Sequence, residues 1–539
     1  MHGTSRIAGR WIRWIGLGVL AMSAQARGAG DYGQLLSLYN EWRAFERPAL
    51  RDGAPDYTPG AMSRRAEGLR ALQARLAAID ATRWPVAERI DHDLVRAQMN
   101  GLEFELRWLR PWQRDPAWYQ VVWTEQSDTP EHEGPTNHAV VELWQYSFPL
   151  DAAAEARLEA GLRVIPPFLA QARGNLTGDA RDLWVTGTGT MRKQADELQA
   201  LGRRVEGAGP GLRAAVADAL AATRAFVEWL EAEAPKKRGP SGVGIEAYEW
   251  NLRNVHLVPM SWAEEVTLLR SELARAWTSL ALEEERNRGL PELVPSADAA
   301  DHARRANAAI TKYLAFLEAR NLIEVQDYID PALRRRIDPY VPPESRNFFS
   351  IASHLEPITL YAHFYHWMDH EWLVRRPNPS PIRRTAWLYN AWDTRAEGMA
   401  TAMEEVILHA GYYDDNPRAR EIVWIMLAQR CARGLAALYA QANRFDLAEA
   451  KAFQVEWTPR GWMHPELDLL GFEQQLYLRQ PGYGTSYVTG KYLIERTIAE
   501  RKRQLGDGFT MRRFFDEFNA AGMVPASLIY WQLTGRPME

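Results

Sequence analysis

The chain has 539 residues, and its 64 lysines and arginines nearly balance 69 aspartates and glutamates, for a net charge of −5. No block of basic residues stands out, so nucleic acid is not an expected partner. The single cysteine, Cys431, excludes an intramolecular disulfide, and a chain of this length can bury a sufficient core without one. Cys431 lies in a helical pattern and is expected to be a buried apolar residue.

The N-terminus has the pattern of a secretory signal peptide. Arg6, Arg10 and Arg13 precede an apolar run, and Ala24-Gln25-Ala26 offers a cleavage site between small residues. The apolar run is about 11 residues long, whereas a membrane span needs about 20. We therefore predict a signal peptide over residues 1–26, cleaved after Ala26, a periplasmic or secreted protein, and no stable membrane anchor. An uncleaved N-terminal anchor is the alternative.

Apolar residues at helical spacing recur along the mature chain. The clearest early stripes are Leu69, Leu72, Leu76 and Ile79, and then Val216, Leu220, Val227 and Leu230. Ser261 and Glu264 form a capping box, which starts a further helix, and another is expected from Ser296 to Arg320. Strand alternation is scarce. The pattern predicts an all-α fold with a large multi-helix body and negligible sheet.

The clearest break in this pattern is the stretch over residues 235–244, which is rich in glycine and proline. It divides the chain into a predicted N-terminal helical lobe, 27–234, and a second lobe, 245–539, that contains the candidate site. A cleft between two lobes is a natural place for a ligand. The aromatic cluster of Trp112, Trp118, Tyr119 and Trp123 is expected to pack in the core, and lining a ligand pocket is the alternative.

Residues 361–371 contain three of the 12 histidines, at spacing i, i+3 and i+7: His363, His366 and His370. On one helix this spacing puts all three on one stripe. After a proline-rich break, Glu397 lies in a second helix-like segment. Two histidines on one helix and a glutamate from its neighbour are a common helical metal site. Zinc is the expected metal and iron the alternative, and a hydrogen-bonded polar patch without metal is also consistent with the pattern.

Four segments, residues 244–254, 397–404, 477–490 and 509–522, carry a resemblance to a known family. The second is similar to the motif EGWALYxE and the third to RYxxxPGxxxSYxxG. Together they resemble a large bacterial family of secreted, mostly helical proteins, catalogued as domain of unknown function eight-eight-five. Its members are regarded as zinc-peptidase-like. The resemblance covers nearly the whole mature chain and implies a metallopeptidase-like scaffold.

The same alignment shows where this chain departs from the family motif HExxPGHH. Counted from His363, Phe364 replaces the glutamate, Trp367 and Met368 replace the Pro-Gly pair, and Asp369 replaces the first of the two final histidines. In a zinc peptidase that glutamate takes a proton from metal-bound water. Its loss typically costs ~10²–10⁴ in rate, so peptide hydrolysis by the family's mechanism is in doubt.

We therefore predict a periplasmic metal-dependent enzyme that acts on a small organic or peptide-like substrate, by hydrolysis or by a repurposed lyase or oxidative reaction. The candidate metal ligands are His363, His366, His370 and Glu397. The candidate catalytic residues are Asp369 or Glu371 as a substitute base and Tyr487 as an acid or oxyanion donor. The candidate substrate-binding residues are Arg479, for an anionic group, and Tyr365. The alternatives are a non-catalytic ligand-binding pseudoenzyme and an active dipeptidase or carboxypeptidase.

Overall fold

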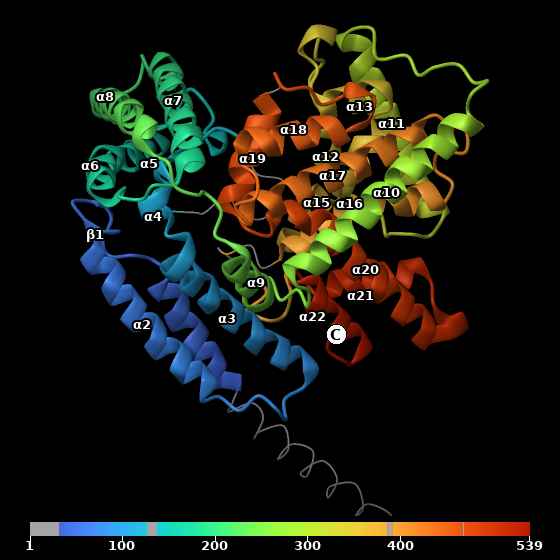
Figure 1. Cartoon of the computed structure of the whole chain (residues 1–539), viewed down its shortest axis with the longest axis horizontal. Coiled ribbons are helices and arrows are strands. Elements are labelled where there is room, and N and C mark those ends of the chain that lie inside the picture. Colours follow the sequence, from blue (N-terminus) through green and yellow to red (C-terminus); the bar gives the residue numbers. More distant parts are fainter. Residues whose placement is uncertain (1–31, 127–136, 385–388, 390–391, 467) are drawn as a thin grey trace, which may run out of the picture.

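The computed structural model describes residues 32–126, 137–384, 389, 392–466 and 468–539 (Figure 1). It confirms the all-α prediction, because helices make up nearly all of the regular structure. The strands among the described residues form two short pairs, β1 (Leu50–Arg51) with β2 (Ala54–Pro55) and β3 (Val122–Trp123) with β4 (Val141–Glu142). The predicted signal peptide lies outside the described residues.

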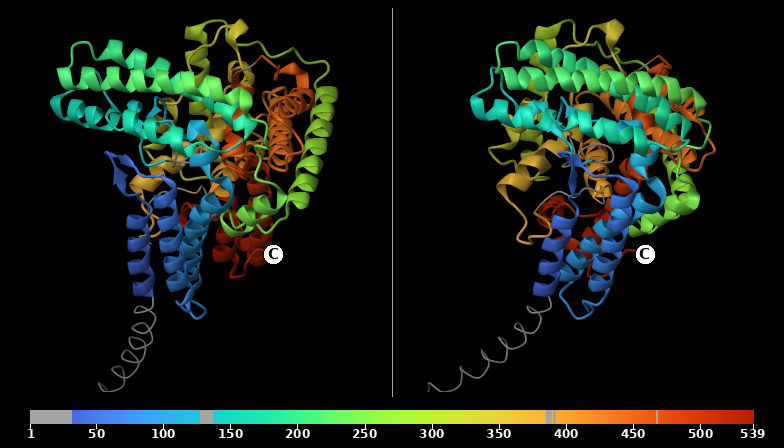
Figure 2. Two further views of the ribbon diagram at one scale, coloured as in Figure 1. Left: turned by 60° about the vertical axis from the view of Figure 1, so that its left-hand side comes forward. Right: turned by 90° about the vertical axis from the view of Figure 1, so that its left-hand side faces the viewer.

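The first half of the chain opens with a helix over residues 32–45. The helices that follow are α2 (Pro59–Ala77), α3 (Val86–Phe104), the π-helix η1 (Glu105–Leu109), α4 (Pro111–Arg114), η2 (Pro116–Tyr119), η3 (Leu143–Gln145), α5 (Ala152–Leu162), α6 (Ile165–Asn175), α7 (Arg181–Arg204), α8 (Pro210–Glu233) and η4 (Ala234–Lys236). Figures 1 and 2 show α5 to α8 gathered in a group beside the larger body.

The second half begins with α9 (Ile245–Asn254) and the long helix α10 (Trp262–Arg286), which starts at the predicted capping box. The helices that follow are α11 (Ala299–Ala319), α12 (Ile329–Arg334), η5 (Pro343–Ser345), α13 (Phe348–Leu355), α14 (Ile358–Tyr361), η6 (Ala362–Phe364), α15 (Tyr365–Arg375), α16 (Asp393–His409), α17 (Ala419–Gln441), α18 (Leu447–Trp457), η7 (Pro459–Gly461), α19 (Asp468–Arg479), α20 (Tyr483–Leu505), η8 (Gly506–Gly508), α21 (Met511–Ala520) and α22 (Ala526–Thr534).

Two large apolar cores fill the described part of the chain. One lies among α4 to α8 and contains Trp112, Trp118 and Tyr119, so this part of the aromatic cluster packs in the core as expected. The larger core joins α2 and α3 to helices of the second half, including α10, α16, α17 and α20. Helices from both sides of the loop at residues 235–244 share the larger core. The division of the chain into two lobes at that loop stays a prediction.

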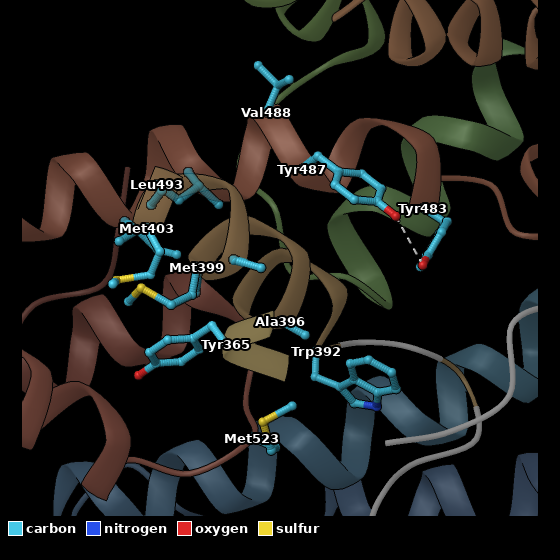
Figure 3. Packing of buried hydrophobic residues seen from close by; sticks show 14 of the residues in the cluster. Tyr365, Trp392, Ala396, Met399, Met403, Tyr483, Tyr487, Val488, Leu493 and Met523 are labelled. Carbon is cyan, nitrogen blue, oxygen red and sulfur yellow. Dashed lines mark hydrogen bonds between the residues drawn. The ribbon is translucent and has the colours of Figure 1, made fainter. Parts of the chain in front are cut away.

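Helix α17 lies deep in the larger core, and nearly all of its side chains are buried. Cys431 is one of them, with no exposed surface, and burial raises the pKa of its thiol, as expected for a buried apolar residue. Beside α17, α16 packs closely on α20. Figure 3 shows Met399 and Met403 of α16 between Tyr365 of α15 and Leu493 of α20. This packing fixes the helices that carry the candidate site.

A stacked histidine pair anchors the segment that leads to the candidate site. The rings of His302 and His354 are 4.1 Å apart, and both side chains are buried. The backbone N–H of Val341 donates to His354 Nε2 over 3.0 Å, which requires that nitrogen to be unprotonated. Burial, with the nearby His302 and Arg346, lowers the pKa of His354 from 6.5 to about 4.

We expect this pair to make the protein less stable in mild acid. The unfolded chain binds a proton at His354 below about pH 6.5, whereas the folded chain resists protonation until about pH 4. Stability should therefore fall as the pH drops from about 6.5 to 4, with His354 contributing about 2 kcal/mol of the loss. Urea unfolding at pH 7 and pH 4.5 measures it. In His354→Gln, which can still accept from Val341 but does not titrate, that part of the pH dependence should disappear.

Candidate metal centre

The three histidines do not share one helical stripe, contrary to the sequence-based expectation. The chain passes from α14 through the tighter 3₁₀ turn η6 before α15 begins, so His363 lies in η6 and His366 in the first turn of α15. A 3₁₀ turn has three residues per turn instead of 3.6, which rotates His363 relative to α15. His370 lies one turn further along, where its ring stacks on Trp367 at 5.0 Å.

Two histidines and one glutamate come together in the interior. Potential ligand atoms of His363, His366 and Glu397 all lie within 4.8 Å of one another, and all three residues are buried. Glu397 Oε2 is 3.1 Å from His366 Nε2 and 3.4 Å from His363 Nε2. The Nε2 atoms of both histidines therefore converge on one carboxylate oxygen. His370 is not a member of this group.

Glu404 orients His363 from the other side of its ring. It lies on α16 two turns after Glu397, and its Oε1 accepts from His363 Nδ1 over 3.0 Å. Arg430 of α17 lies 3.2 Å from the same nitrogen but has a closer acceptor in Glu404 Oε1, at 2.6 Å. We therefore assign the His363 proton to Nδ1. When His363 is neutral, that tautomer leaves the Nε2 lone pair facing Glu397, as in a carboxylate–histidine–metal arrangement.

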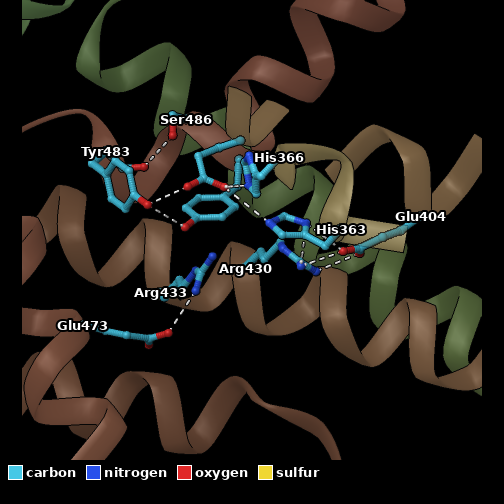
Figure 4. Close-up of polar contacts among 10 residues, drawn as sticks. His363, His366, Glu404, Arg430, Arg433, Glu473, Tyr483 and Ser486 are labelled. Atoms are coloured by element: carbon cyan, nitrogen blue, oxygen red, sulfur yellow. Dashed lines mark hydrogen bonds and ion pairs between the residues drawn. The ribbon is translucent and has the colours of Figure 1, made fainter. Parts of the chain in front are cut away.

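Two tyrosines of α20 complete the surroundings of Glu397. The hydroxyl of Tyr483 donates to Glu397 Oε1 over 2.5 Å, and the hydroxyl of Tyr487 donates to that of Tyr483 over 3.2 Å. The ring of Tyr487 also stacks near His363, with ring centres 6.0 Å apart. Figure 4 shows Tyr483 beside His366 and His363, with dashed lines for the hydrogen bonds and ion pairs among the residues drawn. The predicted site residue Tyr487 thus lies at the centre, one hydroxyl away from the carboxylate.

The charge state of Glu397 suits a ligand role. Burial alone would raise the pKa of this carboxyl, but the positive charge and hydrogen bonds of His366 and His363 outweigh burial and hold the pKa well below its ordinary value. Glu397 is therefore ionised at neutral pH. An ionised carboxylate beside two imidazole Nε2 atoms is a donor set that Zn²⁺ or Fe²⁺ accepts, with positions left open for other ligands.

The two predicted substitute bases are paired with arginines. Asp369 forms a buried bidentate ion pair with Arg395 of α16, in which Nη2 donates to Oδ1 over 2.8 Å and Nη1 donates to Oδ2. Glu371 is only partly buried and pairs with Arg335 at 2.7 Å and Arg375 at 3.5 Å. Neither residue belongs to the group around Glu397. The sequence placed them next to the histidines, but the helix turns their carboxylates to other partners.

The predicted substrate-binding residues also have structural partners. Arg479 at the end of α19 pairs with the buried Asp115 over 2.7 Å and is itself mostly covered, so it joins the second half of the chain to the α4–η2 region. Tyr365 is buried, and its hydroxyl donates to Asn519 of α21 over 2.6 Å. These contacts explain both residues through packing between segments far apart in the sequence.

The neighbourhood contains charged residues that the sequence analysis did not select. Arg430 and Arg433 lie at i and i+3 on α17, and Glu473 lies on α19, where it accepts from Arg433 over 2.9 Å. All three are buried. Two arginines on one face of a mostly apolar helix are a recognisable signal, because a buried guanidinium requires an acceptor. Without the fold, however, the sequence does not say which acceptor faces it.

Comparison with known proteins supports the family. The model of a bacterial protein family of unknown function, DUF885, matches residues 42–307, which confirms over that range the family to which the sequence pointed. The match stops short of the histidine segment and does not bear on the zinc-peptidase character. No curated protein matches the chain.

Two solved structures share the fold over nearly the whole chain. A candidate lipoprotein of unknown function from Shewanella oneidensis matches with a TM-score of 0.67 at 16% identity, covering 93% of this chain and 98% of its own. A candidate lipoprotein from Colwellia psychrerythraea matches with a TM-score of 0.66 at 13% identity, covering 95% and 99%. Within the described residues, no helix has the length and apolar character needed to cross a membrane.

Proposed function

We propose that this protein works outside the cytoplasm and holds one divalent metal ion, zinc in the first instance, through His363, His366 and Glu397. The location is supported by the N-terminal signal pattern and by the lipoprotein descriptions of the two structural relatives. The metal is supported by one observation above all. Two imidazole Nε2 atoms and an ionised carboxylate converge in the interior, and Glu404 fixes the tautomer of one imidazole.

The activity that best fits this site is hydrolysis of a small organic or peptide-like molecule. A zinc ion at such a site supplies Lewis acidity, which polarises a carbonyl group or a bound water. The chain's own contribution would be orientation and proton handling. Tyr483 and Tyr487 form a chain of hydroxyls that ends at Glu397 Oε1, and each hydroxyl donates its one proton within that chain. The Tyr487 hydroxyl would donate to a developing oxyanion by turning its proton away from Tyr483.

The proton-accepting group of the family motif has no direct substitute. Phe364, at that position, stacks on Tyr361 with ring centres 4.6 Å apart. Asp369 forms an ion pair with Arg395, and Glu371 forms one with Arg335. These pairings favour the second candidate, a metal-binding protein that captures a ligand without turnover. Zinc binding without hydrolysis of any member of a panel of dipeptides and esters would select it.

A zinc titration tests the metal site. Protein stripped with a chelator and titrated with Zn²⁺ in a calorimeter is expected to bind about one ion per chain. Glu404→Gln, which weakens the acceptor at His363 Nδ1, should bind zinc about 10- to 100-fold more weakly. Glu371→Gln is the matched control and should bind as the wild type does. Absence of a stoichiometric zinc site in the wild type would contradict the proposal.

A further inference from the structure

Arg433 is a buried cation whose hydrogen-bonding capacity the protein leaves largely unused. It lies on α17 with only 4% of its surface exposed. Its Nη1 donates to Glu473 Oε1 over 2.9 Å, whereas Nε has no hydrogen-bond partner, and no hydrogen bond from Nη2 is seen within the described part of the chain. Unpaired donors of a buried guanidinium are costly, so an acceptor that the described residues do not supply, a bound ligand or a water, would stabilise them.

The unused nitrogens form one edge of the guanidinium plane. Nε and Nη2 point the same way, and this is an edge with which arginine binds a carboxylate through two parallel hydrogen bonds. Glu473 occupies the other side, at Nη1, and lies 3.4 Å from the amide nitrogen of Gln429. Glu473 therefore holds Arg433 in place without occupying the edge that binds carboxylates.

The location connects this edge to the metal centre. The Arg433 guanidinium lies 3.9 Å from the ring centre of Tyr487, whose hydroxyl leads through Tyr483 to Glu397. Figure 4 shows Arg433 between Glu473 and Tyr483. Burial would lower the pKa of Arg433, but Tyr477, Tyr487, Glu473 and Glu397 together raise it well above its ordinary value, so the cation stays charged.

The charge balance of the site also favours an anion. The buried carboxylates around the centre are Glu397, Glu404 and Glu473, and the buried cations facing them are Arg430 and Arg433. A divalent ion would displace the protons that His363 and His366 hold towards Glu397, so the histidines of a metal-loaded site are neutral, and the three negative and two positive charges leave a net charge of −1 before the ion itself is counted. One divalent ion changes this to +1, which a ligand with a single negative charge would neutralise.

We propose that Arg433 binds the carboxylate of the substrate, and that the site therefore selects small or peptide-like molecules with a free carboxylate. This assignment rests on the proposed metal-dependent function and gives its substrate class. It transfers to Arg433 the anion-binding role that the sequence suggested for Arg479, whose guanidinium is already paired with Asp115.

A matched pair of probes tests the assignment. N-acetyl-L-phenylalanine and its carboxamide differ only in the charged group, and each is titrated into the zinc-loaded protein in a calorimeter. The wild type should bind the carboxylate at least about 10-fold more tightly than the amide. Arg433→Gln should reduce that preference to less than about 3-fold, and Arg433→Lys, which keeps the charge but not the two-donor edge, should lose most of it. Arg213→Gln, on exposed α8, is the control and should keep the full preference.

Zinc binding and probe binding are measured separately, so that failure of the Arg433 assignment and failure of the proposed function can be distinguished. Zinc affinity of the Arg433 variants, measured in the same way, should stay within about 3-fold of the wild type, because Arg433 contacts none of the three ligands. Equal binding of the two probes by the wild type, absence of carboxylate binding, or a preference that survives both substitutions would overturn the assignment while zinc still bound. Absence of zinc binding by the wild type would instead refute the proposed function.

Discussion

Replacing both His363 and His366 with alanine is expected to weaken zinc binding by more than about 100-fold. Loss of a residue that only hydrogen-bonds to a metal ligand typically weakens metal binding by about 10- to 100-fold, and this variant loses two ligands. The variant keeps Glu397 as the single member of the group, and one carboxylate is a poor zinc site. The buried carboxylate also loses two of its partners, which should cost about 1–3 kcal/mol of stability. Zinc calorimetry and urea unfolding of the metal-free protein measure the two effects separately.

His370→Ala is the matched control for this variant. It removes a histidine from the same helix, but one that lies outside the group of His363, His366 and Glu397. Zinc affinity should therefore remain as in the wild type. If His370→Ala weakened zinc binding as strongly as the double variant does, His370 would also be a ligand, as expected from the sequence, and the grouping of His363, His366 and Glu397 alone would be wrong.

The sequence predicted the fold class and proposed His363, His366, His370 and Glu397 as metal ligands, of which the structure brings His363, His366 and Glu397 together. Apolar spacing and the capping box at Ser261 depend on local physics, and both predicted helix correctly. The sequence could predict that His363 and His366 lie close to each other, because residues one helical turn apart are neighbours. The sequence could not predict that His370 lies outside the group, because its position relative to His363 depends on the short 3₁₀ turn η6, which apolar periodicity does not reveal.

The partners of single charged residues could not be predicted from the sequence for another reason. Asp369 is adjacent to His370 in sequence, yet its partner is Arg395, 26 residues away on α16. Arg479 pairs with Asp115, which the chain brings close only after both halves have folded. A buried charged side chain pairs with an opposite charge close to it, and which residue lies close is determined by the tertiary structure. Buried arginines such as Arg433 are more informative when their donors remain unpaired in the completed fold.

The close contact between α16 and α20 is expected to have a large effect on both stability and zinc binding. A Cβ atom at Gly398 would lie 2.5 Å from the carbonyl carbon of Gly490, and one at Gly490 would lie 2.8 Å from the Cα of Gly398 and nearer still to the carbonyl oxygen of Thr394. These distances are well inside van der Waals contact, and the obstacles are backbone atoms, which no rotamer change can move. The two helices can approach this closely only because both positions are glycine.

Gly490→Ala is therefore expected to destabilise the protein by about 3 kcal/mol or more, since the helices must separate to admit the methyl group. The separation would also weaken zinc binding, because Glu397 directly precedes Gly398 and its partner Tyr483 lies on α20. Urea unfolding and zinc calorimetry measure both. Gly189→Ala, at an exposed position of α7 where a Cβ meets no atom within 4 Å, should instead stabilise the protein by up to about 1 kcal/mol. Unchanged stability of Gly490→Ala would show that α16 and α20 do not pack backbone to backbone, and that the position of Glu397 against the tyrosines has another origin.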